Sequence, residues 1–163
     1  MRALETLYDD QGYQVALFPL QELYISQGDT GTTSHDFSRY YATDCVGYIN
    51  GSRVLRCPCY APCDIQLIWK DSTECCAMWK SINKVHLADG SISYIGIIVY
   101  HDNDIQNNTY YSVGTIKRQG EEFNKTDSDN DNVIFVPSDI AEGSKLVYYV
   151  WDSFTNMISL YPS

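Results

Sequence analysis

The sequence predicts a single, mostly β domain over residues 1–163, built as an antiparallel sheet or sandwich. Aromatic residues make up 13% of the chain, with 14 tyrosines, and such residues prefer the pleated, half-buried surface of a sheet. The dipeptides Asn50-Gly51 and Asp89-Gly90 are strong signals for tight hairpin turns between strands. A chain of 163 residues is long enough to bury a substantial core.

The first half of the chain divides into short apolar runs that predict strands. These strands cover residues 14–20, 23–25, 40–48, 53–60, 64–70 and 76–85, the last being a strand pair or one long bent strand. Residues 27–34 are rich in Gly, Thr and Ser and predict a loop. The strand over 40–48 would present Asp44 towards a site, because a carboxylate in an apolar stretch needs a partner.

The second half continues the same pattern, and no segment has a convincing helical period. Predicted strands cover residues 91–100, 110–117, 133–136, 146–151 and 154–161. The polar segments 102–109 and 126–132 predict loops, and Gln119-Gly120-Glu121 predicts a turn.

The charge of the chain restricts its partners. The formal net charge is −10, which argues against nucleic acid, because phosphate binding needs clustered Lys and Arg. No run approaches the ~20 apolar residues that span a bilayer, and Met1–Asp10 contain no apolar signal region. We therefore expect a protein made in the cytoplasm without a signal peptide, and either association with a virion or release on lysis is compatible with this.

Six cysteines leave the redox state open. The simplest interpretation is reduced thiols, several of them buried as small apolar residues. Disulfides are a second interpretation. A cysteine zinc site is a third, although the spacing of Cys57, Cys59, Cys63, Cys75 and Cys76 does not match paired zinc knuckles.

A series of short motifs follows one another along the chain: Phe18-Pro19, Ile25-Ser26-Gln27-Gly28, Thr33-Ser34-His35, Tyr41-Ala42-Thr43-Asp44, Tyr60-Ala61-Pro62-Cys63-Asp64, residues 79–85, Asp89-Gly90, Tyr94-Ile95, His101-Asp102, Val113-Gly114 and residues 119–123. In their order and spacing these motifs resemble phage-type domains of peptidase family M23 (lysostaphin/LytM-like). The resemblance is strongest over residues 14–125, and residues 126–163 diverge. It implies the LytM-like fold.

The resemblance also implies roles for individual residues. His35 and Asp44 correspond to zinc ligands, and His101 is similar to the histidine that polarises the scissile carbonyl or relays a proton. The family closes its site with His-x-His on a strand, but the most natural match here is Asn132-Val133-Ile134. A hydrolytic zinc site needs about three protein ligands and an open water position, so one ligand is missing.

These observations predict a catalytically degenerate domain of phage or prophage origin, with no zinc or weakly bound zinc. Its expected partners are peptidoglycan peptides or other virion and tail proteins, and the candidate ligand-binding residues are Tyr40, Tyr41, Tyr110 and Tyr111. The alternative is an active zinc endopeptidase that cleaves peptidoglycan cross-bridges, with Asp129, Asp131 or a cysteine as the replacement ligand.

The acidic run over residues 127–132 also resembles the start of a calcium loop. It lacks the glycine at position 6 and the glutamate at position 12, which are Asn132 and Ser138 here. A solvated polar loop is the interpretation that the sequence favours for this run.

Overall fold

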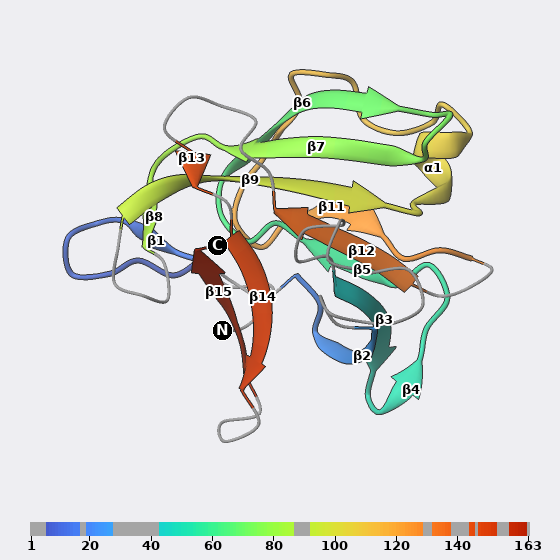
Figure 1. Cartoon of the computed structure of the whole chain (residues 1–163), viewed down its shortest axis with the longest axis horizontal. Coiled ribbons are helices and arrows are strands. Elements are labelled where there is room, and N and C mark those ends of the chain that lie inside the picture. Colours follow the sequence, from blue (N-terminus) through green and yellow to red (C-terminus); the bar gives the residue numbers. More distant parts are fainter. Residues whose placement is uncertain are drawn as a thin grey trace.

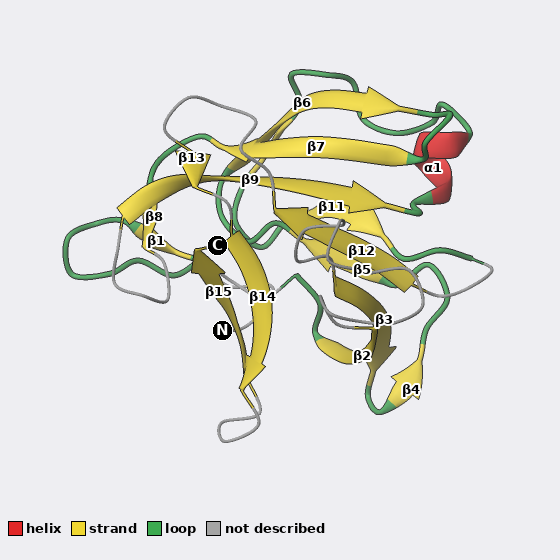
Figure 2. Ribbon diagram, in the orientation of Figure 1, coloured by secondary structure: helices red, strands yellow, loops and turns green. Residues whose placement is uncertain are grey.

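The computed structural model describes residues 6–16, 19–27, 43–86, 92–128, 132–137, 144–145, 147–152 and 157–162. For residues 23–27 and 43–45, and for the segments from 132 onward, it describes the backbone alone. Strands dominate the described residues, and nearly all neighbouring strands are antiparallel (Figures 1 and 2). The predicted mostly β, antiparallel architecture is confirmed.

The main sheet has a continuous path of antiparallel strands. Across the sheet, these strands are β10 (Ile116–Lys117), β6 (Ile65–Asp71), β7 (Cys76–Ser81), β9 (Ile92–Tyr100), β12 (Asn132–Pro137), β3 (Thr43–Ile49) and β2 (Glu22–Gln27). β12 comes late in the chain but lies between β9 and β3. This insertion brings distant segments of the sequence together in the centre of the sheet (Figure 1).

The remaining elements are short or form separate pairs. β4 (Ser52–Arg53) extends β3, β8 (Val85–His86) joins β1 (Gln14–Val15) to β9, and β13 (Ser144–Lys145) runs parallel to part of β9. Two further pairs are β5 (Pro58–Tyr60) with β11 (Glu122–Lys125) and β14 (Val147–Asp152) with β15 (Met157–Pro162). The helix α1 (Asn103–Gln106) directly follows β9 and is a single turn.

The strand period explains which face of β7 is buried. Ala77, Trp79 and Ser81 are buried, while Met78 and Lys80 on the opposite face are half-buried. Alternation of this kind is expected where one face of a sheet covers a core. Trp79 pairs with Ile97 of β9, which is also buried.

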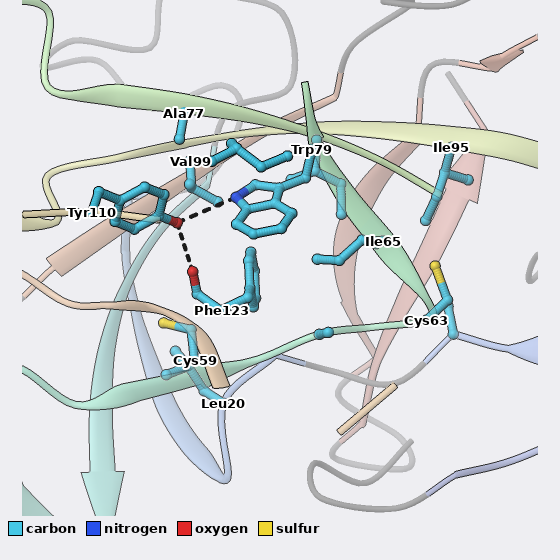
Figure 3. Packing of buried hydrophobic residues seen from close by; sticks show 14 of the residues in the cluster. Leu20, Cys59, Cys63, Ile65, Ala77, Trp79, Ile95, Val99, Tyr110 and Phe123 are labelled. Atoms are coloured by element: carbon cyan, nitrogen blue, oxygen red, sulfur yellow. Dashed lines mark hydrogen bonds between the residues drawn. The ribbon is translucent and has the colours of Figure 1, made fainter. Parts of the chain in front are cut away.

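Trp79 is the centre of the core (Figure 3). Its ring meets the Phe123 ring edge-on at a centroid distance of 5.5 Å, and its Nε1 donates to the Tyr110 hydroxyl at 3.2 Å. The same hydroxyl lies 2.6 Å from the Phe123 carbonyl oxygen. Burial raises the pKa of Tyr110 well above its ordinary value. The polar atoms of both side chains are therefore hydrogen-bonded inside the core, as buried polar groups require.

The Asn50-Gly51 hairpin is confirmed. Ile49 of β3 pairs with Ser52 of β4, and the two residues between them have φ values of 51° and 74°. Positive φ at both central positions is the requirement of a type I′ turn, which Asn and Gly meet most easily. Asp89-Gly90 lies outside the described residues.

Several sequence predictions of local structure are wrong. In the predicted strand over residues 53–60, residues 54–57 are not strand. The predicted strand over residues 110–117 is strand only at β10, because Tyr110 enters the core and residues 112–115 form a turn against β6. The predicted loop over residues 102–109 contains α1, whose N-cap is Asp102. The Asp102 side chain accepts a hydrogen bond from the Asp104 N–H, a standard way to begin a helical turn.

Candidate functional site

Three adjacent strands bring together the segments in which site residues were predicted. Ile134 of β12 pairs with Asp44 of β3 on one side and with Tyr100 of β9 on the other. Asn132 pairs with Val46. Neighbouring strands lie about 4.8 Å apart, so the Asp44 and Tyr100 backbones are separated by about 10 Å. His101 follows Tyr100 directly, so it lies just beyond the end of β9 that pairs with Ile134.

His101 has an unusual backbone conformation. Its φ is 78°, in the left-handed region that residues with a side chain seldom adopt. Its N–H donates to the Cys75 carbonyl oxygen at 3.0 Å, which ties the end of β9 to the turn before β7. The side chain is 36% exposed, so its imidazole is accessible to a ligand.

A carboxylate lies beside this imidazole. His101 Nδ1 is 4.0 Å from Asp127 Oδ2, and the Asp127 side chain is only 12% exposed. The sequence prediction of a solvated loop is therefore wrong for Asp127. The carboxylate is largely buried because the chain before and after it is hydrogen-bonded to the interior.

The buried carboxylate of Asp102 holds the segment next to His101. Its Oδ1 accepts from Arg56 Nη1 at 2.6 Å, and its Oδ2 accepts from the Lys125 N–H at 2.7 Å. Burial alone would lower the pKa of Arg56, but its contacts with Asp102 and Asp104 raise it. The ion pair is charge-assisted and largely shielded from water, so it fixes the turn after β9.

Two more contacts hold the chain on either side of Asp127. Thr126 exchanges hydrogen bonds with Cys57, from Cys57 N to Thr126 Oγ1 at 2.8 Å and from Thr126 N to Cys57 O at 3.0 Å. Ser128 N donates to Asn103 Oδ1 at 3.0 Å. Asp127 is thus held from both sides, through Cys57 just before β5 and through Asn103 of α1.

Several predicted site residues cannot be placed as side chains. His35, Tyr40, Tyr41, Asp129 and Asp131 lie outside the described residues, and Asp44 is described by its backbone alone. Their roles stay predictions.

The other two tyrosines predicted to bind a ligand are described. Tyr110 is 8% exposed with its hydroxyl bonded inside the core. Tyr111 packs against the core, and Lys117 Nζ lies 4.1 Å from its ring centroid. Tyr110 is therefore a core residue, whereas the side chain of Tyr111 is partly exposed to solvent.

His86 lies away from this site. It is in β8, and its Nδ1 is 2.8 Å from Asp9 Oδ2. Its side chain is 37% exposed. The chain therefore holds a second histidine–aspartate pair.

The described side chains do not make a zinc site. No group of three or more His, Cys, Asp or Glu side chains among them is placed to hold a metal ion. His101 and Asp127 together offer two donors, fewer than the three a hydrolytic zinc needs.

The cysteines in the described part of the chain are core thiols. Cys57, Cys59, Cys63 and Cys76 are buried and Cys75 is partly buried. Burial raises the pKa of Cys63, and burial together with the charges of Asp71 and Glu74 raises the pKa of Cys76 to about 11. Thiols of this kind are mostly protonated at neutral pH and are poor nucleophiles.

The sequence reasoning missed Asp127, Asp102 and Arg56 as members of this site. Asp102 stood next to a predicted site residue, but nothing local indicated that it is buried. Asp127 and Arg56 lie in distant segments, and only the fold brings them to His101.

Comparisons with known proteins give a limited match. No family model matches the chain. Over 110 residues the chain is 33% identical to Morphogenesis protein 1 of Bacillus phage B103. The match covers 68% of this chain and 27% of that protein, so the chain spans about a quarter of the length of this relative. Among the described residues, the structure has no helix with the length and apolar character of a membrane span.

Proposed function

We propose that the chain is a phage-type LytM-like domain that has lost zinc hydrolysis and acts in a phage particle by binding peptides of peptidoglycan. The Asp44–Ile134–Tyr100 row across β3, β12 and β9 carries this proposal. It brings the strand matched to the family's His-x-His next to the strand of Asp44 and next to the end of β9. The resemblance requires those three segments to meet, and the register supports it.

The residues on β12 argue against hydrolysis. Asn132 and Ile134 stand where the family has its two histidines. An isoleucine side chain has no donor atom for a metal, and an asparagine cannot act as a general base near neutral pH. A scaffold with an accessible His101 but without these groups is suited to binding a ligand rather than to cleaving it.

The relative supports a role in the virion. Morphogenesis protein 1 of Bacillus phage B103 is named for phage morphogenesis, and the match covers 68% of this chain. Association with other virion proteins follows as part of the proposal, either together with peptidoglycan binding or in place of it.

Co-sedimentation with peptidoglycan sacculi tests the binding role. We expect the purified chain to pellet with sacculi of a Bacillus strain, and the His101→Ala variant to pellet less. The matched control is His86→Ala, which removes a half-exposed histidine paired with Asp9 away from the site. Failure of the chain to co-sediment, with its fold intact by circular dichroism, would leave only the structural virion role.

An active zinc endopeptidase is the second candidate. Asp129 and Asp131 directly precede β12, which pairs with the strand of Asp44, so a replacement carboxylate is close in sequence to the site. Release of soluble muropeptides from sacculi by the zinc-supplemented chain, abolished by Asp44→Ala, would establish this candidate and exclude the non-catalytic one. We expect no release.

A further inference from the structure

His101 is held in a conformation that residues with a side chain seldom adopt. Its φ of 78° is close to the 82° of Gly120, where a glycine adopts the conformation without strain. A strained backbone at a residue other than glycine persists only when its surroundings determine it, and such residues cluster at functional sites. The reason for the strain should therefore be found around the His101 side chain.

The surroundings of His101 place a carboxylate next to one ring nitrogen. Nδ1 lies 4.0 Å from Asp127 Oδ2, somewhat longer than a hydrogen bond. At this distance the carboxylate still attracts a proton carried on Nδ1 through its charge.

We propose that Asp127 is a positioning residue for His101. The Asp127 carboxylate accepts the Nδ1 proton, so the neutral ring carries its proton on Nδ1. Nε2 then becomes the hydrogen-bond acceptor that the ring offers to a ligand N–H, such as a peptide amide. This inference rests on the proposed peptide-binding site and names the group within it that contacts the peptide.

The buried contacts around Asp102 explain why Asp127 stays in place. Asp102 directly follows His101 and accepts from the Lys125 N–H, while Asn103 accepts from the Ser128 N–H. The two residues after His101 therefore hold the chain on both sides of Asp127. Arg56 forms an ion pair with Asp102 at 2.6 Å and another with Asp104 at 2.8 Å, and both hold this turn. The backbone segments that carry the imidazole and the carboxylate are thus tied to each other.

The tautomer of His101 tests the proposal directly. In a chain labelled with ¹⁵N-histidine, the chemical shifts of the ring nitrogens show which of them carries the proton. The measurement is made at about pH 8.5, where imidazoles are neutral. We expect His101 to be mainly the Nδ1–H form, whereas an imidazole without a partner is mainly the Nε2–H form. His86, with Nδ1 at 2.8 Å from Asp9, is the internal reference for an Nδ1–H ring.

Variants separate positioning from general structure. Asp127→Ala should lower the ratio of Nδ1–H to Nε2–H at His101 by about tenfold or more, since a bond to a charged acceptor is lost. Asp127→Asn keeps an acceptor oxygen and should produce a smaller shift. The matched control is Asp104→Asn, which changes a nearby carboxylate that contacts Arg56 but not His101; it should leave the ratio unchanged.

Two results would overturn the proposal: a predominant Nε2–H form in the unmodified chain, or an unchanged ratio in Asp127→Ala. If Asp127→Ala does not fold, the tautomer ratio of His101 in the unmodified chain and in Asp127→Asn still tests the proposal. The sacculus experiment is independent of this measurement. An Nδ1–H ring in a chain that does not bind sacculi would reject the proposed function but keep the positioning role.

Discussion

Two carboxylates of the chain, Asp64 and Asp102, accept hydrogen bonds from the same kinds of donor, an arginine side chain and amide N–H groups. Asp64 accepts hydrogen bonds from Gln14 Nε2 and the Gln119 N–H, both at 2.9 Å, and from Arg118 Nη1 at 3.0 Å. Asp102 accepts from an arginine and from two backbone N–H groups. Each carboxylate also lies near a residue with positive φ.

The two regions differ in what occupies that strained position. Near Asp64 it is Gly120, which has no Cβ and carries no cost. Near Asp102 it is His101, and the left-handed conformation costs such a residue about 1–2 kcal/mol. The Asp64 region is therefore explained by stability alone. Under the proposed function, the strain at His101 places a partly exposed imidazole next to Asp127.

The largest effect is expected from Asp102→Ala. The Asp102 side chain is 2% exposed, so the substitution removes a buried acceptor from the Asp104 and Lys125 N–H groups and takes from Arg56 the more buried of its two carboxylate partners. We expect the free energy of unfolding to fall by about 3–5 kcal/mol, measured by urea denaturation with tryptophan fluorescence. The loss should exceed that of Asp64→Ala, because the Asp64 partner Arg118 is 63% exposed.

Asp104→Ala is the control for this prediction. It removes the more exposed carboxylate bound to the same arginine, and its effect should stay within about 1 kcal/mol. Equal losses for Asp102→Ala and Asp64→Ala would mean that burial does not distinguish the two regions.

A smaller effect is expected from Asp64→Asn, and it should depend on pH. Burial alone would raise the pKa of Asp64, but hydrogen bonds from Gln14, Gln119 and Arg118 outweigh burial and leave the pKa lowered. A lowered pKa in the folded state stabilises the protein above the unfolded value of about 3.9, and this contribution is lost as the pH falls through the folded pKa. At neutral pH the variant should lose about 1.5 kcal/mol.

The pH dependence gives this second prediction its measurement. Urea midpoints recorded from about pH 6 to about pH 2 should fall less steeply for Asp64→Asn than for the unmodified chain. Arg118→Gln is the control, because two of the three donors to Asp64 remain. Parallel pH profiles for the unmodified chain and Asp64→Asn would show that this carboxylate is not stabilised by folding.

The strands and turns could be predicted where the local sequence determines them. Asn50-Gly51 specifies its own hairpin through its backbone preferences, and the β-branched run of β9 matches a central strand. The segment 110–117 could not be predicted, because tertiary contacts override its apolar pattern. Tyr110 is buried in the core and hydrogen-bonded to Trp79, while the side chains of Val113 and Ile116 are 57% and 46% exposed.

The candidate site could be predicted only in part, for the same physical reason. His101 was identifiable because it directly follows an apolar strand and stands before a polar segment. Asp127 stood in a run of polar residues that had no distinguishing local feature. Its burial depends on Asp102, Asn103 and Cys57, which come from separate segments of the chain.

The smallest effect compares the two strained positions directly. His101→Ala and His101→Gly both remove the imidazole, so the difference between them isolates the backbone. We expect His101→Gly to be about 1 kcal/mol more stable than His101→Ala by urea denaturation, because glycine adopts a φ of 78° without the Cβ penalty. Gly120→Ala should show the opposite change, a loss of about 1 kcal/mol at a φ of 82°. If His101→Gly and His101→Ala were equally stable, the turn after β9 would relax without the imidazole. The strain would then be a consequence of the His101 side chain and not of the contacts around Asp102.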